Sequence, residues 1–73
     1  MDTIIYCEWK DACAYSGWDS EENYNLCLIK SVGFLVKETK EKIVLAVSKS
    51  DGEFNAVMVI PKAWIVKKKT LEL

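Results

Sequence analysis

Residues 43–60 decide the class of fold, and they read Ile43-Val44-Leu45-Ala46-Val47-Ser48-Lys49-Ser50-Asp51-Gly52-Glu53-Phe54-Asn55-Ala56-Val57-Met58-Val59-Ile60. Residues 43–47 and 54–60 are rich in β-branched side chains and lack the 3.6-residue period of an amphipathic helix. Between them, Asp51-Gly52 is a dipeptide typical of tight hairpin turns. The stretch therefore predicts a third and a fourth strand joined by a hairpin loop over residues 48–53.

Two strands are expected before this hairpin. Residues 3–11 are rich in β-branched and aromatic side chains, and their alternation places Ile5, Cys7 and Trp9 on one face, which we expect to face a core. Residues 26–37 predict a longer strand that is apolar on both faces. A glycine near the middle of that strand, Gly33, favours a sharp bend. The polar residues 38–41 that follow predict a tight turn.

The chain after the hairpin predicts one more strand. Pro61 has no N–H to donate to a ladder, so we expect it to end the fourth strand. Residues 61–64 then form a short corner, and residues 65–67 form the fifth strand. The remainder, which ends with Leu71 and Leu73, is expected to be a frayed tail.

Five short antiparallel strands with a strand-breaking corner before the last one are typical of a small, strongly bent all-β barrel of the SH3-like or Sm-like kind. The 73 residues leave room for a single domain spanning 1–73. The 51% hydrophobic fraction exceeds what one small barrel interior holds easily. We therefore expect identical copies to associate and share the excess apolar surface.

Charge is unevenly distributed along the chain. Residues 1–29 hold six acidic residues and Lys10, whereas residues 30–73 hold nine lysines and five acidic residues. The basic half could lie on a polyanion or dock on the acidic half of a neighbour, and both interpretations stay open. Every basic residue is a lysine, which lacks the planar fork that reads guanine edges, so sequence-specific reading of duplex DNA is not expected.

The residue types argue against an enzyme, against a bound cofactor and against a membrane protein. The chain has no histidine, no cysteine–base pair and no glycine-rich phosphate loop. Its three cysteines, Cys7, Cys13 and Cys27, lack metal-site spacing, so we expect reduced thiols in a cytoplasmic protein. The loop acids Asp11, Asp19, Glu21 and Glu22 are expected to be solvated and not metal ligands. No apolar run reaches the length of a membrane span, and no leader is visible.

Residues 33–45 and 60–65 resemble the two motifs of the Sm and Sm-like family. The first motif, Gly-x-hydrophobic followed by a polar turn and a hydrophobic strand, is matched by Gly33-Phe34-Leu35-Val36-Lys37-Glu38-Thr39-Lys40-Glu41-Lys42-Ile43-Val44-Leu45. The second, hydrophobic-Arg-Gly-x-x-hydrophobic, is matched in spacing by Ile60-Pro61-Lys62-Ala63-Trp64-Ile65. The front half, with Glu8-Trp9-Lys10-Asp11-Ala12 and Gly17-Trp18-Asp19, is similar to small proteins of phage and marine metagenomic origin.

The resemblance implies where binding residues would lie. The family's Asp-x-x-x-Asn is replaced by Thr39 and Ile43 and its Arg-Gly by Pro61-Lys62, so the family's grip on uridine does not carry over. What remains implied is a homo-oligomeric ring of about five to seven subunits that holds RNA or single-stranded DNA on lysine-lined turns. The implied nucleic-acid residues are Thr39, Lys40, Lys42, Lys62 and Trp64. The expected subunit interface is Val57, Val59, Ile60, Ile65 and Val66.

The residues of these sites can also be explained by ordinary structural roles. Lysines on hairpin turns are usually solvated, and strands four and five could be inner strands of a monomer. Trp9 is expected to be buried, whereas Trp18 lies in a polar loop and Trp64 is the best candidate for base stacking or an interface. The alternative function is a phage structural or adaptor protein, or a binder of a host protein, that uses the acidic loop of residues 14–25 and no nucleic acid.

Overall fold

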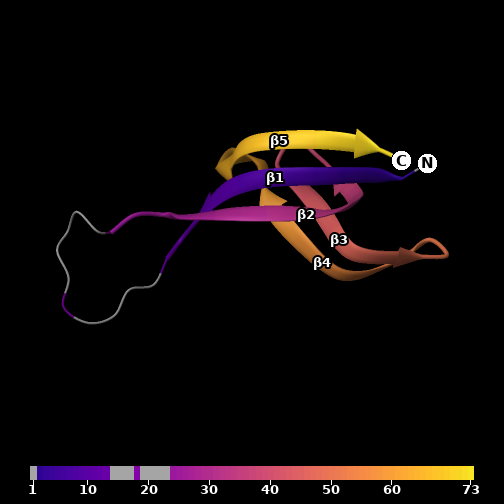
Figure 1. Cartoon of the computed structure of the whole chain (residues 1–73), viewed down its shortest axis with the longest axis horizontal. Helices are drawn as coiled ribbons and strands as arrows, with labels where there is room; N and C mark the ends of the chain where they lie inside the picture. The colour runs from indigo at the N-terminus through magenta and orange to yellow at the C-terminus, as the bar shows by residue number, and fades with distance from the viewer. Residues whose placement is uncertain (1, 14–17, 19–23) are drawn as a thin grey trace.

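A computed structural model describes residues 2–13, 18 and 24–73, and it shows a single antiparallel sheet of five strands (Figure 1). The strands are β1 (Thr3–Asp11), β2 (Cys27–Glu38), β3 (Lys42–Ser50), β4 (Glu53–Pro61) and β5 (Ile65–Glu72). A three-residue 3₁₀ helix, η2 (Lys62–Trp64), joins the last two strands. The all-β class and the five expected strands are confirmed.

The sheet is bent but open, so the expected barrel is not closed. Its strand order is β4-β3-β2-β1-β5, which places β4 at one edge and β5 at the other. The three residues of η2 connect these two edge strands. Each edge strand therefore has one partner within the described chain, β3 for β4 and β1 for β5.

The core lies where the bent sheet folds over itself. Ile5, Cys7 and Trp9 of β1 are buried, as the alternation of residues 3–11 predicts. They pack with Ile43 and Leu45 of β3 and Ile60 of β4 in one apolar cluster. Trp9 also donates its indole N–H to Ser31 Oγ over 3.1 Å, so its one polar atom is satisfied.

Gly33 is required at the bend of β2. An added Cβ atom would lie 2.7 Å from the carbonyl oxygen of Ala46 and 3.2 Å from Cβ of Leu45. Only a residue without a side chain lets β3 approach β2 so closely. The bend expected from this glycine is therefore explained by the close approach of the neighbouring strand.

The hairpin between β3 and β4 turns at Asp51 and Gly52, which have φ angles of 47° and 78°. Two successive positive φ angles are the signature of a type I′ turn, which Asp-Gly favours. The loop is shorter than the one expected over residues 48–53, because β3 continues to Ser50 and β4 begins at Glu53.

The expected frayed tail is wrong. β5 spans Ile65–Glu72 and pairs with β1 up to Thr3↔Glu72. Backbone hydrogen bonds of 2.8 and 2.7 Å join Asp2 and Leu73 in both directions. The two ends of the chain therefore lie side by side, as Figure 1 shows.

The expectation of three reduced thiols is also wrong for two of the cysteines. Cys13 and Cys27 form a disulfide, with Cα atoms 5.5 Å apart. β1 and β2 pair as far as Asp11↔Cys27, so the chain that leaves β1 is still beside β2 two residues later. Cys7 is free and buried, and burial raises the pKa of its thiol.

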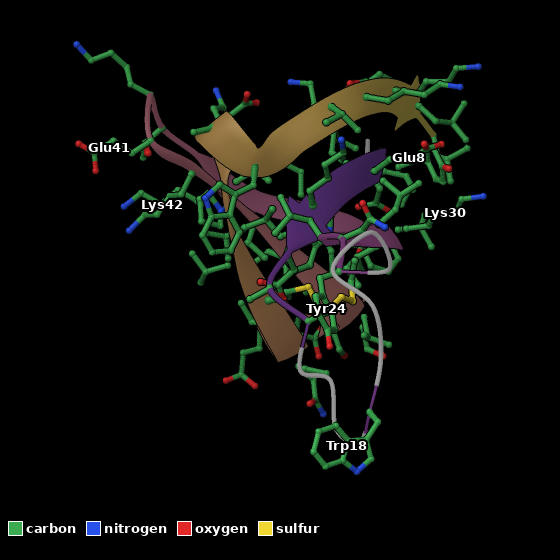
Figure 2. The ribbon with its side chains drawn as sticks, turned by 90° about the vertical axis from the view of Figure 1, so that its left-hand side faces the viewer. Glu8, Trp18, Tyr24, Lys30, Glu41 and Lys42 are labelled. Atoms are coloured by element: carbon green, nitrogen blue, oxygen red, sulfur yellow. A yellow bond between two sulfur atoms is a disulfide. The ribbon has the colours of Figure 1, made fainter. Side chains whose placement is uncertain are left out.

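The acidic loop that the alternative function would use lies between these two cysteines in the sequence. Residues 14–17 and 19–23, which include Asp19, Glu21 and Glu22, lie outside the described residues. Trp18 is described and is fully exposed, as Figure 2 shows.

Candidate functional site

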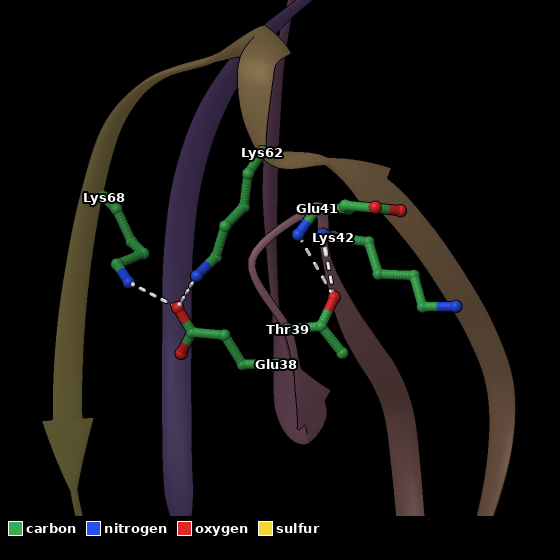
Figure 3. Close-up of polar contacts among 6 residues, drawn as sticks. All are labelled: Glu38, Thr39, Glu41, Lys42, Lys62 and Lys68. Atoms are coloured by element: carbon green, nitrogen blue, oxygen red, sulfur yellow. Dashed lines mark hydrogen bonds and ion pairs between the residues drawn. The ribbon is translucent and has the colours of Figure 1, made fainter.

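The turn between β2 and β3 is held by hydrogen bonds of Thr39 (Figure 3). Its backbone N–H donates to the carbonyl oxygen of Lys42 over 2.9 Å. Its Oγ1 accepts from the backbone N–H groups of Glu41 and Lys42, each at 3.2 Å. Thr39 thus fixes the turn and leaves the side chains of Lys40 and Lys42 exposed to solvent.

The η2 helix lies against this turn. The backbone N–H of Lys62 donates to the carbonyl oxygen of Glu41 over 2.8 Å. Lys42 and Pro61 are the last pair of the β3–β4 ladder, so both segments lie at the same end of one hairpin. The structure therefore brings together four of the five implied nucleic-acid residues, Thr39, Lys40, Lys42 and Lys62.

Glu38, the last residue of β2, accepts from two lysines of distant segments (Figure 3). Its Oε2 atom lies 2.6 Å from Nζ of Lys62 and 3.2 Å from Nζ of Lys68 on β5. The hydrogen bond from Lys62, and then that from Lys68, lowers the pKa of the Glu38 carboxyl. Neither Glu38 nor Lys68 is among the implied nucleic-acid residues, and the sequence predicted Lys68 to lie in a solvated tail.

One end of the molecule is therefore strongly basic. We define the basic end as Lys37, Lys40, Lys42, Lys62 and Lys68, together with Glu38 and Glu41. Five lysines and two glutamates leave a net charge of +3 there. Within the described chain, three of these lysines (37, 40 and 42) make no ion pair. Figure 2 shows Glu41 and Lys42 on the side of the molecule opposite Glu8 and Lys30.

Trp64, the fifth implied residue, makes different contacts. Its ring stacks on that of Trp9, with centroids 6.3 Å apart and an angle of 18° between the planes. It is 46% exposed and lines a mainly apolar groove of about 380 Å³ with Leu26, Val66 and residues 10–12. One face of the Trp64 ring is thus covered by Trp9, and the residue lies at the C-terminal end of η2.

The five expected interface residues divide into two groups. Val57 and Val59 are half-exposed on β4, and Val66 is half-exposed on β5. These valines therefore sit at opposite edges of the sheet. Ile60 is completely buried and Ile65 packs against the core, so their side chains serve the fold of their own chain.

The strand register aligns apolar residues of neighbouring strands in a row that the sequence analysis did not predict. Ile4 pairs with both Leu71 and Phe34, Phe34 pairs with Ala46, and Ala46 pairs with Val57. Paired residues lie on the same face of a sheet, so this row crosses all five strands, and its β3 member, Ala46, is buried at 1% exposure. It ends at the edges with Leu71 and Val57, which are 56% and 49% exposed.

The described residues thus define a small open all-β protein with a basic end, two free edges and an apolar row between those edges. Comparison with protein-family models, curated proteins and solved structures finds no match. Within residues 2–13, 18 and 24–73, no three acidic or cysteine side chains gather as metal ligands. Over the same ranges, no helix has the length and apolar character needed to cross a membrane.

Proposed function

We propose that this chain is a non-enzymatic protein that binds single-stranded nucleic acid, RNA or DNA, through its basic end and associates with copies of itself through its sheet edges. The observation that carries the proposal is the convergence of five lysines from β2, the Thr39 turn, β3, η2 and β5 on one end with a net charge of +3. Lysines on exposed turns hold a phosphate backbone electrostatically and with little sequence preference.

Trp64 favours a single strand over a duplex as the ligand. Bases of a single strand are unpaired and can turn out to lie on an aromatic ring, and such stacking is sequence-tolerant. Its stack on Trp9 holds the Trp64 indole in place while leaving 46% of the residue exposed. Trp64 lies two residues after Lys62, so one strand that crosses η2 could contact both side chains.

Replacing Lys40 and Lys42 together with alanine should weaken binding of a fluorescein-labelled oligouridylate about tenfold at low salt. Each lost lysine–phosphate contact should cost roughly threefold in affinity, on the scale of about 0.2–1 kcal/mol for an exposed ion pair, so two contacts cost about tenfold. The measurement is fluorescence anisotropy at several salt concentrations, and the logarithmic salt dependence should become shallower by about 1.4. Lys30→Ala is the matched control, because Lys30 is exposed on the opposite side (Figure 2).

Lys30→Ala removes a single charge, so its loss is compared with those of the single variants Lys40→Ala and Lys42→Ala. Equal losses in the three single variants would show that net charge, and not the basic end, sets the affinity. Binding that does not depend on salt, or no binding of oligouridylate or oligothymidylate by the wild-type protein, would refute the proposed function.

Self-association is proposed from the two unpaired sheet edges and the apolar row that reaches both. An edge strand presents unpaired N–H and C=O groups to a neighbouring chain. Joining β4 of one copy to β5 of the next would continue the row from Val57 to Leu71 and cover both side chains. Repetition of one such contact closes a ring when the rotation between copies permits it.

Light scattering should give the wild-type protein a mass several times the 8.3 kDa of one chain. Val57→Glu should reduce it to a monomer, because a carboxylate at the β4 edge would be desolvated in the contact. Val47→Glu makes the same change at an exposed valine of the inner strand β3 and should leave the mass unchanged. A wild-type monomer at all concentrations would refute the ring.

The disulfide favours a second candidate function. Disulfides persist in oxidising surroundings such as the exterior of cells and virions. The Cys13–Cys27 pair therefore fits a particle or adaptor component better than a protein that works in a reducing cytoplasm. A protein of this kind would form a stable complex with another protein and would not bind oligonucleotides at low salt.

A further inference from the structure

Glu38 occupies a position in which one oxygen atom is shared by two ammonium groups. Its Oε2 atom accepts from Lys62 Nζ at 2.6 Å and from Lys68 Nζ at 3.2 Å (Figure 3). The two lysines come from η2 and β5, and the glutamate comes from the end of β2. The fold, not local sequence, thus places two cations at the distance that a single oxyanion requires.

The three side chains remain open to solvent. Their relative exposures are 32% for Glu38, 32% for Lys62 and 37% for Lys68. Lys62 and Lys68 also line a shallow hollow of about 240 Å³ beside Ile65. An anion from solution can therefore reach both ammonium groups without unfolding any part of the sheet.

Exchange of Glu38 for an external anion would cost little. Exposed lysine–carboxylate pairs contribute little to the stability of a folded protein. A backbone phosphate, in contrast, offers a charged oxygen to both lysines and releases condensed counterions when it binds. The neighbouring lysines 37, 40 and 42 are not ion-paired in the described chain, so they add attraction for the same strand.

We propose that Glu38 stands in the place of a backbone phosphate of the bound single strand, and that Lys62 and Lys68 move from its carboxylate to that phosphate on binding. This inference rests on the proposed function and adds a regulatory feature to it. Glu38 acts as an internal competitor that keeps affinity low and holds the two lysines in position while the site is free.

Glu38→Gln tests the inference, with Glu41→Gln as its matched control. Both substitutions remove one negative charge from the basic end. Only Glu38 ties up lysines, because the described chain shows no ion pair to the carboxylate of Glu41. Release of two lysines should tighten binding of fluorescein-labelled oligouridylate about tenfold at low salt. The slope of the logarithmic salt dependence should stay nearly unchanged, because Lys62 and Lys68 contact the phosphate in both complexes. Glu41→Gln should change affinity by about threefold or less.

A gain in Glu38→Gln that the Lys62→Ala, Lys68→Ala background abolishes would support the exchange. Equal gains in the Glu38 and Glu41 variants would overturn it, because net charge alone would then explain them. Weaker binding by a Glu38→Gln protein whose thermal unfolding is unchanged would overturn it as well. If neither the wild-type protein nor any variant binds, the proposed function and this inference both fail, whereas salt-dependent wild-type binding with no effect of Glu38→Gln refutes the inference alone.

Discussion

Replacing Ile60 with alanine should lower the free energy of unfolding by about 3 kcal/mol, within the usual range of roughly 2–5 kcal/mol for such truncations. The Ile60 side chain is fully buried and packs in the cluster formed by β1, β3 and β4. Small domains bury a limited core and have little stability in reserve. We therefore expect a substantial fraction of Ile60→Ala molecules to be unfolded at physiological temperature.

Urea unfolding followed by tryptophan fluorescence measures this loss, since Trp9 is part of the same core. Val59→Ala is the matched control because Val59 is the adjacent residue of β4 and is 57% exposed. Its cost should be about 0.5 kcal/mol, as for ordinary surface substitutions. If Ile60→Ala instead dissociates an oligomer without changing the unfolding of the monomer, Ile60 belongs to the interface that the sequence predicted.

The contrast between these two residues shows how far the sequence could predict the fold. The strands and turns were predictable because their signals are local: period-two alternation in residues 3–11, and turn chemistry at Asp51-Gly52. Alternation also places Val59 and Ile60 on opposite faces. It does not say which face of a strand is covered when both are apolar, since that depends on how far the sheet bends over itself.

The length of β5 could not be predicted for a different reason. Three consecutive lysines at residues 67–69 are typical of a solvated tail, and the run carries no strong strand signal. What orders it is pairing with β1, at the other end of the chain, including the contact of Thr3 Oγ1 with Glu72 at 2.7 Å. Long-range pairing of this kind leaves no local trace in the sequence.

Only part of the candidate site could be predicted from the sequence. The resemblance to the Sm-like motifs grouped Thr39, Lys40, Lys42 and Lys62. The structure places their two segments together at the end of one hairpin, whose ladder ends at Lys42↔Pro61. Lys68 reaches Glu38 only because β5 pairs with β1, which in turn pairs with β2. The strand order, not any motif, therefore created the two-lysine contact, and no sequence signal could have revealed it.

Removal of the disulfide should cost about 3 kcal/mol, because a cross-link that closes a loop of this length restricts the unfolded chain by that amount. The double variant Cys13→Ser, Cys27→Ser should therefore unfold at a temperature lower by roughly 12–24 °C, on the scale of 4–8 °C per kcal/mol for domains of this size. Thermal unfolding followed by circular dichroism checks the shift, and a thiol count on the denatured wild-type protein should give the single free Cys7.

Reduction of the wild-type protein provides the control for the two new serines. A reducing agent should lower the wild-type midpoint to that of the double variant and should leave the double variant unchanged, since Cys7 has no disulfide partner. Identical midpoints for the oxidised, reduced and doubly substituted proteins would contradict the predicted contribution. If the shift is found, the folded chain depends on an oxidising environment for part of its marginal stability, and oligonucleotide binding should be measured on the oxidised protein.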